Sequence, residues 1–562
     1  MRVTDQAGAT SAATVTERVG QQAITFAAPA AHTYGDAPFT VTATGGPSGA
    51  PVTFSAGPVQ VCASGGTNGA TITLSGAGTC TVTASQAGAA GYQAATPVQQ
   101  SFTVRQATLT VTAADKAMTY GGAVPALTAT YSGFVNGDTA THSSGSNNPL
   151  YMTITGAPAC ATSATSGGPS GGGSPVGSYP ITCTRGTLGA ANYTFAFQPG
   201  TLTVNPAALT ITADNQHTVY GQLPPTFTVT SHGLVNGDTL AALQGTLHVA
   251  TIATQFSAPG TYALTPSGLS SPNYTINYGV GTLTVSQDAS TATLTSSRNP
   301  APFGQPVTLT VKVGAASPGA GTPSGAVTFL DGGVPIGTAT LANGQASLTT
   351  ATLLGGTHSL SVSYGGDSNF IASTPAALSQ AITFSRTLDG TVNGPQTIHS
   401  GESVLISGAV NGPLTVQAGG SVALMGAHVN GPLRVSGAVA VALCGSTVNG
   451  VVSISESTGF VRIGGGTDDP GVSCTGNTLQ SSVALNGNKG GVEVEGAKVS
   501  GPLSLTNTSG ADPNGDSAAP ELEGNTIGGS LSCSGNTPPP TSDGQPNTVS
   551  GPKLGQCNVP GM

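Results

Sequence analysis

The chain has 562 residues, a formal net charge of −9 and only 6% charged residues. A chain so poor in Lys and Arg lacks the basic stripe that nucleic-acid binding requires. The absence of Trp disfavours a sugar-binding platform of stacked rings. Its 83 Gly and 39 Pro lie between short runs in which Val, Thr, Leu and Ile alternate, which is typical of half-buried strands. We therefore predict an all-β protein with almost no helix.

The start of the chain, residues 1–19, reads as a remnant strand or linker of a preceding β domain. It has no apolar core segment of a signal peptide, and no run in the sequence is apolar for long enough to span a membrane. We expect that the chain is the C-terminal piece of a longer exported protein, or that its translation start site has been assigned too late. Residues 20–105 form the first predicted β domain, in which we interpret Tyr34 as an aromatic packed between strands.

Two further domains, 106–205 and 206–285, share the same words in the same order. Each has a Tyr-Gly step (120–121 and 220–221), a "VNGDT" segment (135–139 and 235–239) and a closing "NYT" (192–194 and 273–275). A repeat of this length is a domain array rather than a solenoid of short units. Asn and Gly tolerate the positive φ of tight turns. We therefore predict that Asn136, Gly137, Asn236 and Gly237 are turn residues.

The aspartates of these segments, Asp138 and Asp238, could alternatively bind calcium, although no run of alternating acidic ligands surrounds them. If the segment is only a turn, Asn136→Ala should cost about 1–2 kcal/mol of stability, because it forces a non-glycine residue into positive φ. Asp138→Ala should cost less, under about 1 kcal/mol, for one lost local hydrogen bond.

Residues 286–384 form the fourth predicted domain, a strand-rich segment in which Asp367 of "YGGDSNF" reads as a turn residue rather than a metal ligand. Residues 385–562 repeat a shorter phrase. "TVNGPQTI", "AVNGPLTV", "HVNGPLRV" and "TVNGVVSI" place asparagines at 393, 411, 430 and 449, with spacings of 18, 19 and 19. This period fits one coil of a parallel β-solenoid.

Within each predicted coil, Val and Leu alternate inward and Asn-Gly makes the corner. Stacked corners would align Asn393, Asn411, Asn430 and Asn449 in a ladder of side-chain hydrogen bonds. Open solenoid ends invite aggregation. We expect the preceding domain to cap one end and the Pro-rich C-terminal tail, with its cysteines, to close the other.

The eight cysteines fall in local pairs. Such pairing favours disulfides made in an oxidising compartment, each worth roughly 3 kcal/mol in the chain-entropy model. Free thiols and zinc remain alternatives, but no C-x-x-C motif and no nearby histidine cluster supports the metal. The predicted disulfides are Cys62–Cys80, Cys160–Cys183, Cys444–Cys474 and Cys533–Cys557.

Catalysis finds little support. β-Helices often carry polysaccharide lyases and hydrolases, which need clustered carboxylates or a basic residue on one face. Glu493 and Glu495 are two positions apart and share a strand face, which permits a catalytic pair of carboxylates. Two solvent-exposed glutamates without a catalytic role are more common than such a pair. The eight histidines show no metal-ligand pattern. The solenoid's candidate catalytic residues are Glu456, Arg462, Asp468, Asp469, Glu493, Glu495 and Lys498.

The "YG", "VNGDT" and "NYT…GTLTV" words of residues 106–285, and more loosely residues 20–105, resemble the MBG domains of the YGX type found in large bacterial surface proteins. The segment "GAVTFLDGGVPIGTATLANGQASLTTATLLGGTHSLSVSYGGDSNFIAST" at 325–374 resembles a bacterial Ig-like domain of group 3. The resemblance implies small β domains, Ig-like sandwiches among them, in an extracellular, bacterial cell-surface protein.

The expected function is that of a non-enzymatic structural or adhesion protein, in which a β-domain stalk presents or anchors the solenoid. A glycan-active enzyme on the C-terminal β-helix is the alternative, and a filament-forming solenoid is a third hypothesis, since the coil resembles that of bactofilins. We expect no cofactor and no metal. Partners are expected among surface glycans or other surface proteins and not among nucleic acids, and the oligomeric state is left open.

Overall fold

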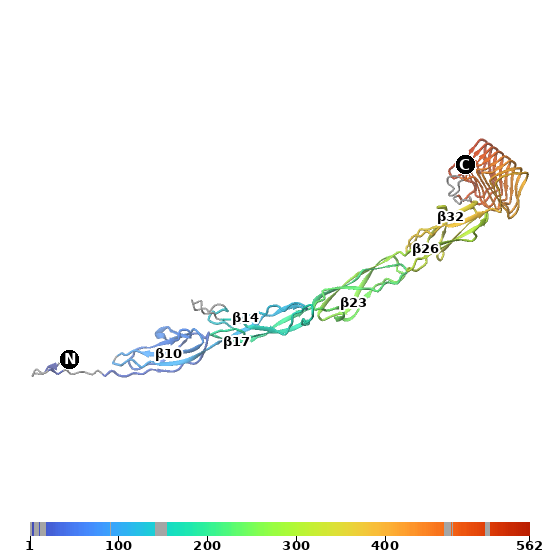
Figure 1. Cartoon of the computed structure of the whole chain (residues 1–562). Helices are drawn as coiled ribbons and strands as arrows, with labels where there is room; N and C mark the ends of the chain where they lie inside the picture. Colours follow the sequence, from blue (N-terminus) through green and yellow to red (C-terminus); the bar gives the residue numbers. More distant parts are fainter. Residues whose placement is uncertain are drawn as a thin grey trace. The chain divides into compact units, whose positions relative to one another are not determined.

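The structure is a computed structural model that describes residues 18–89, 91–140, 154–465, 474, 476–511 and 517–562, together with the backbone of two short strands before them (Figure 1). These two strands, β1 (Val3–Thr4) and β2 (Thr10–Ser11), pair antiparallel. The described chain is all-β, as predicted, and its helical elements are two single 3₁₀ turns, η1 (Thr67–Gly69) and η2 (Leu240–Ala242). No helix of the described residues has the length and apolarity that a membrane span requires.

Contacts divide the chain into two compact units. One comprises residues 1–212, 229–249 and 266–279, and the other comprises residues 213–228, 250–265 and 280–562.

The first domain, within 20–105, has sheets of order β4-β11-β10-β7, β5-β9-β8 and β3-β6. Its longest strand, β10, buries every second side chain, which is the alternation expected of a sheet with one face on a core. The strands are β3 (Thr25–Phe26), β4 (His32–Thr33), β5 (Phe39–Thr40), β6 (Ala43–Thr44), β7 (Val52–Gly57), β8 (Cys62–Gly65), β9 (Thr71–Leu74), β10 (Gly78–Gln86) and β11 (Val98–Arg105).

The next two domains repeat one topology, with sheets β14-β12-β17 and β13-β18-β16-β15 in the second domain and β21-β19-β24 and β20-β25-β23-β22 in the third. In the second domain the strands are β12 (Ala107–Ala113), β13 (Lys116–Thr119), β14 (Ala129–Ser132), β15 (Ala159–Thr162), β16 (Gly177–Thr184), β17 (Tyr193–Gln198) and β18 (Gly200–Asn205). In the third they are β19 (Ala207–Ala213), β20 (Gln216–Val219), β21 (Val229–His232), β22 (Gln244–Ala250), β23 (Gly260–Ser270), β24 (Tyr274–Gly279) and β25 (Gly281–Ser286).

The fourth domain is a sandwich of sheets β26-β28-β31 and β27-β33-β32-β29-β30. Its core is formed by inward residues of both sheets, among them Leu309, Val311, Phe329, Leu360 and Val362. Its strands are β26 (Ser290–Ser296), β27 (Ala301–Pro302), β28 (Val307–Ala315), β29 (Ala326–Asp331), β30 (Val334–Thr340), β31 (Gln345–Thr350), β32 (Gly356–Tyr364) and β33 (Leu378–Thr383).

His358 on β32 links three parts of this sandwich. Its Nδ1 lies 2.5 Å from Asp331 Oδ2, and its Nε2 lies 2.7 Å from the carbonyl oxygen of Leu354. Both partners are acceptors, so only the doubly protonated ring donates to both. Burial alone would lower the pKa of His358, but the Asp331 carboxylate and the Leu354 carbonyl outweigh it and raise the pKa above 6.5.

We predict a pH-dependent stability for this domain. Because the folded-state pKa of His358 is raised, its stabilisation is fully present below about pH 6.5 and is lost as the pH rises through the folded-state pKa. Pulsed hydrogen exchange on β32 peptides of the full chain in urea, between about pH 5 and 8, measures how the free energy of unfolding of this domain depends on pH. His358→Gln should abolish the excess stability at the acidic end. Equal acid sensitivity in wild type and variant would contradict the assignment.

Residues from 386 onward form the predicted solenoid, seen as stacked coils near the C-terminus in Figure 1. In its described part each coil contributes one strand to each of three all-parallel sheets, except the last, which contributes strands to sheets 2 and 3 only. Sheet 1 contains β34 (Arg386–Leu388), β37 (Ser403–Ile406), β40 (Ser421–Met425), β43 (Ala440–Cys444), β46 (Val461–Ile463), β49 (Val492–Glu495) and β52 (Glu521–Glu523).

Sheet 2 contains β35 (Thr391–Asn393), β38 (Ala409–Asn411), β41 (His428–Val429), β44 (Thr447–Val448), β47 (Thr478–Leu479), β50 (Lys498–Val499), β53 (Thr526–Ile527) and β55 (Thr548–Val549). Sheet 3 contains β36 (Gln396–Ile398), β39 (Leu414–Val416), β42 (Leu433–Ser436), β45 (Val452–Ser455), β48 (Val483–Asn486), β51 (Leu503–Thr506), β54 (Leu531–Ser534) and β56 (Lys553–Gly555). The alternate Val, Leu and Ile residues of the three sheets form one continuous buried core, as predicted.

The asparagine ladder is confirmed. The amide nitrogen of each asparagine donates to the side-chain oxygen of the preceding one, at 2.8 Å from Asn411 to Asn393 and at 2.7 Å for the next two steps. We predict that Asn430→Ala, which removes two of these exposed bonds, lowers the free energy of unfolding of the solenoid by about 1 kcal/mol. Asn393→Ala removes one bond at the end of the ladder and should cost about half as much. Urea unfolding compares the midpoints, and equal costs for the two variants would contradict a ladder.

The expectation that the fourth domain caps an end of the solenoid is wrong. Phe303 of that domain instead packs on the outer face of sheet 1, where Ala423, Ala440 and Ala442 belong to the same buried cluster. The Phe303 ring meets Phe460 edge-on with centroids 5.8 Å apart. Small side chains at these outward positions leave room for the ring.

Candidate functional site: the joints between consecutive domains

The repeated "YG", "VNGDT" and "NYT" segments come together at the boundaries between consecutive domains. β11 ends at Arg105 and β12 begins at Ala107, while β18 ends at Asn205 and β19 begins at Ala207, so a single residue links each pair of domains. The Tyr-Gly step of each domain is held beside its own last strand. The backbone N–H of Tyr34 donates to the Arg105 carbonyl at 2.8 Å. Each step therefore faces the domain that follows.

We call the contact between the first and second domains the first joint. Asp138 of the "VNGDT" segment is only 5% exposed. Its Oδ2 accepts a hydrogen bond from the Tyr34 hydroxyl of the preceding domain at 3.0 Å and from the Tyr193 hydroxyl of its own domain at 2.8 Å. The two rings meet edge-on with centroids 5.7 Å apart. One carboxylate thus joins two phenols across a domain boundary.

The second joint, between the second and third domains, repeats this arrangement. Asp238 Oδ2 accepts from the Tyr120 hydroxyl at 3.0 Å and from the Tyr274 hydroxyl at 2.8 Å. The Tyr120 and Tyr274 rings again meet edge-on, with centroids 5.4 Å apart. Equal geometry at two places in the sequence shows that the repeated words encode a contact between domains.

The "VNGDT" segment forms a turn that presents this carboxylate. Asn136 has φ 55° and Gly137 has φ 75°, and the equivalent residues of the next repeat have φ 57° and 71°. The N–H of Asp138 closes the turn by donating to the Val135 carbonyl at 3.0 Å. The predicted turn role of Asn136, Gly137, Asn236 and Gly237 is therefore confirmed.

Tyr34 is a buried, packed aromatic, as predicted, but its hydroxyl and ring also contact the next domain, which was not predicted. The expectation that Asp138 contributes one local hydrogen bond is wrong. Asp138 and Asp238 each bind two tyrosines. Among the described residues, no group of three His, Cys, Asp or Glu side chains could hold a metal ion, so the calcium alternative gains no support at either joint.

The closing "NYT" segments contribute a second contact to each joint. Asn192 Oδ1 accepts from the backbone N–H of Ala77 in the first domain at 2.9 Å, and Asn273 Oδ1 accepts from Val176 in the second at 3.0 Å. The carbonyl of Asn192 also accepts a hydrogen bond from the backbone N–H of Ala107, the first residue of β12. Asn and Tyr of each segment thus bind the preceding domain side by side.

Electrostatics favour the neutral phenol at both joints. Burial raises the pKa of Tyr34 and of Tyr193, and the neighbouring Asp138 charge raises each further. Burial likewise raises the pKa of Tyr274 to about 12. The hydroxyls of Tyr34, Tyr193 and Tyr274 therefore remain protonated donors to the carboxylates across the physiological range.

The glycine after each of these tyrosines is required by close approach. Gly35, Gly121 and Gly221 have φ of 99°, 81° and 82°. A Cβ on Gly35 or Gly121 would overlap the side chain of Val135 or Val235, and one on Gly221 would overlap the backbone of Ala320. The Tyr-Gly step thus combines a tyrosine side chain with a glycine that has no Cβ, so that the next domain can approach closely.

The third joint, between the third and fourth domains, is aromatic and has no Tyr–Asp–Tyr set in its described residues. The Tyr220 ring meets Phe370 of "SNF" edge-on, with centroids 5.4 Å apart. Phe370 occupies the place of the closing tyrosine, because the Asn369 carbonyl accepts from Asp288 N–H as the Asn192 carbonyl accepts from Ala107. Asp367 is the predicted turn residue, since its Oδ1 accepts from the N–H groups of Asn369 and Phe370.

The four disulfides join the pairs expected from the spacing of the cysteines: Cys62–Cys80, Cys160–Cys183, Cys444–Cys474 and Cys533–Cys557. Each closes a short loop inside one domain. They fix the domains internally and leave the joints to non-covalent contacts.

The solenoid's candidate catalytic residues do not form an open acid–base pair. Glu493 and Glu495 are buried, against the expectation of exposed side chains. Glu493 Oε2 accepts from Arg462 Nε at 3.1 Å, with side chains 2% and 1% exposed. Glu456 is the turn residue of another corner, with φ 53°, and Lys498 is exposed on sheet 2. Asp468 and Asp469 lie outside the described residues.

Comparison with known proteins agrees with the repeats. The family model of the MBG domain (YGX type) matches residues 109–203 and 209–284, and that of the bacterial Ig-like domain (group 3) matches residues 294–383. No curated protein matches the chain at a significant level.

Solved structures with some similarity include fibronectin(III)-like modules of Clostridium thermocellum CbhA, at 16% identity over 31% of this chain and 94% of that chain, with a TM-score of 0.16. The Escherichia coli adhesin FdeC is 13% identical over 64% of this chain and 96% of that chain, with a TM-score of 0.15. The S-layer protein rSbsC is 13% identical over 64% of this chain and 54% of that chain, with a TM-score of 0.15. Superpositions this slight carry no argument about function.

Proposed function

The chain contains two MBG domains of the YGX type and a bacterial Ig-like domain of group 3, and from this premise we propose a non-enzymatic extracellular or cell-surface structural or adhesion protein. A stalk of β domains presents or anchors the C-terminal solenoid. The observation that carries the proposal is the Tyr–Asp–Tyr contact, which recurs at two successive domain boundaries. A one-residue linker and a buried hydrogen-bonded contact hold neighbouring domains in one orientation, which a stalk requires.

Composition and covalent chemistry support an extracellular location. Disulfides persist in oxidising compartments, and four are formed within the described residues. A weakly charged surface with net charge −9 fits partners such as surface glycans or other surface proteins and disfavours nucleic acid.

Single-molecule energy transfer between dyes on the first and second domains of the full chain tests the stalk. We expect one narrow distance distribution in the wild type. Tyr34→Phe removes the hydroxyl that reaches Asp138 from the preceding domain and should broaden the distribution. Tyr131→Phe, which changes another tyrosine of the second domain outside the joint, should leave it unchanged. A broad wild-type distribution would contradict a stalk.

A panel of surface glycans incubated with the full chain tests the non-enzymatic part of the proposal. Binding without release of new reducing or unsaturated sugar ends supports presentation or adhesion. Released ends that persist in Glu493→Gln would place catalysis elsewhere in the chain, and ends that disappear in this variant would restore the β-helix enzyme hypothesis.

A further inference from the structure

The two ends of the solenoid share a feature that the coils between them lack. In sheet 1, an inward column runs from Val404 through Val422 and Val441 to Val461 and Val492, all buried in the core. The residue above Val404 in this column, on the first strand β34, is Arg386. A cation therefore occupies the position that a valine fills in the coils below.

Arg386 does not turn away from this position. Its guanidinium donates to the carbonyl of Thr397 on β36 at 3.3 Å, so the side chain reaches from sheet 1 to sheet 3 across the first coil. Leu388 and Val392 of the same coil are only partly buried, whereas Ile406 and Val410 beneath them are fully buried. Arg386 thus lies over the apolar mouth of the core.

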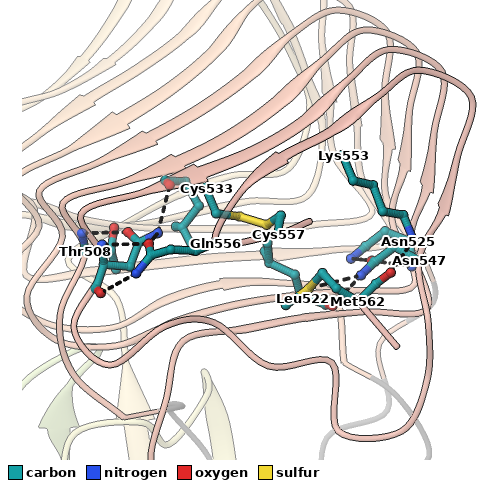
Figure 2. The surroundings of a disulfide bond; sticks show 11 residues. Thr508, Leu522, Asn525, Cys533, Asn547, Lys553, Gln556, Cys557 and Met562 are labelled. Carbon is teal, nitrogen blue, oxygen red and sulfur yellow. Dashed lines mark hydrogen bonds between the residues drawn. A yellow bond between two sulfur atoms is a disulfide. The ribbon is translucent and has the colours of Figure 1, made fainter. Parts of the chain in front are cut away.

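The last coil repeats this device on another sheet. An inward column of sheet 3 runs through Leu414, Leu433, Val452 and Val483 to Leu531, and the next residue in register is Lys553. Lys553 Nζ donates to the main-chain oxygen of Met562. Figure 2 shows Lys553 and Met562 on the same side of the Cys533–Cys557 disulfide, where the tail folds beneath the last coil.

We propose that Arg386 and Lys553 keep the solenoid from stacking end to end. The first strands of the three sheets and the last strands of sheets 2 and 3 have one sheet neighbour each, so their outer backbone groups form an edge that could pair with a second copy. The last strand of sheet 1, β52, is already hydrogen-bonded on its outer side to Thr541. Pairing would bury each cation between two apolar cores with no Asp or Glu of the described residues bonded to it, since each donates to a main-chain oxygen, and such burial is strongly unfavourable. The same edges without the cations would be complementary to a second solenoid end.

This inference concerns assembly and is independent of the stalk proposed above. It disfavours the filament hypothesis, because a filament needs both ends of the solenoid to be open.

Sedimentation of the full chain over a range of concentrations tests the inference. We expect a wild-type monomer, dimers of Arg386→Val, in which the first coil gains the residue type of its column, and longer assemblies of Arg386→Val/Lys553→Leu. Arg434→Val is the matched control, because Arg434 is an exposed cation on the outer face of sheet 3. It should remain monomeric.

Wild-type chains that associate with concentration, or a folded double variant as monomeric as wild type, would overturn the inference. Circular dichroism and intact disulfides establish folding. If Arg386→Val does not fold, Arg386→Met keeps the aliphatic stem and removes the charge. Association of folded Arg386→Met supports the inference, and a monomer at every concentration contradicts it.

Discussion

Asp138→Ala is expected to lower the melting temperature of the second domain by roughly 10–20 °C. The substitution leaves the Tyr34 and Tyr193 hydroxyls, on side chains 4% and 2% exposed, without this acceptor. An unsatisfied buried polar group costs about 1–3 kcal/mol. Because the Tyr193 hydroxyl keeps only a long 3.4 Å contact with the Val135 carbonyl as acceptor, we expect about 2–3 kcal/mol for the two hydroxyls together. For a domain of this size, 1 kcal/mol shifts the melting temperature by about 4–8 °C. Calorimetry of the full chain measures the shift.

Two controls accompany this variant. Asp138→Asn keeps an acceptor oxygen at the same place and should show a clearly smaller shift. Asp389→Ala removes an exposed carboxylate from the solenoid and should leave the transition of the second domain unchanged. A shift for Asp138→Ala no larger than that for Asp389→Ala would return Asp138 to the role of a simple turn residue.

Gly221→Ala is expected to destabilise the third joint by about 2–5 kcal/mol. Two effects add. An alanine at φ 82° costs about 1–2 kcal/mol, and its Cβ would overlap the backbone of Ala320, which must move. Such overpacking costs about 1–3 kcal/mol more. Hydrogen exchange at Asp288 and Ile371, whose N–H groups are hydrogen-bonded in this joint, reports the loss.

Gly332→Ala separates the two effects. Gly332 also has positive φ, at 57°, but no atom lies within 4 Å of a Cβ built there. It should therefore show only the cost of the backbone conformation. If Gly221→Ala and Gly332→Ala cost the same, close packing of Ala320 on the Tyr-Gly step does not contribute to the joint.

Much of the fold was predictable because its signals are local. Asn136 and Gly137 indicate a turn by their tolerance of positive φ, and the spacing of Asn393, Asn411, Asn430 and Asn449 gives the coil length directly. The ladder follows once the coils stack in register. After Asn449 the period widens, and Val448 pairs with Leu479 across a longer coil, which a strict 19-residue repeat does not anticipate.

The joints could not be predicted in the same way. The contact between Tyr34 and Asp138 spans 104 residues and crosses a domain boundary, and no turn or alternation rule links the two positions. The signal was present as the co-occurrence of "YG", "VNGD" and "NYT" in each repeat. The joint recurrence of these three segments indicates one shared contact, since a turn accounts for only the "VNGD" segment.

Two features of the solenoid were not predicted from the sequence: the buried asparagines of the later corners and the burial of Glu493. Buried asparagines support the later corners from inside, as where Asn525 Oδ1 accepts from Ala497 N–H at 2.9 Å and its amide donates to the Val494 carbonyl at 2.7 Å. The recurring "GN" pairs of the later coils were the available signal. Burial of Glu493 was hidden because alternation shows which residues share a face but not what covers that face.

The central claim is that one carboxylate couples two domains, and a double-mutant cycle on Tyr34 and Asp138 tests it most directly. Tyr34→Phe, Asp138→Ala and the double variant are compared in the full chain by urea unfolding of the second domain. Residues in one hydrogen-bonded network show interaction energies of about 0.5–3 kcal/mol, and we predict at least about 1 kcal/mol here. Strictly additive costs would show that the two domains do not act through this contact, and would contradict the account of the joint.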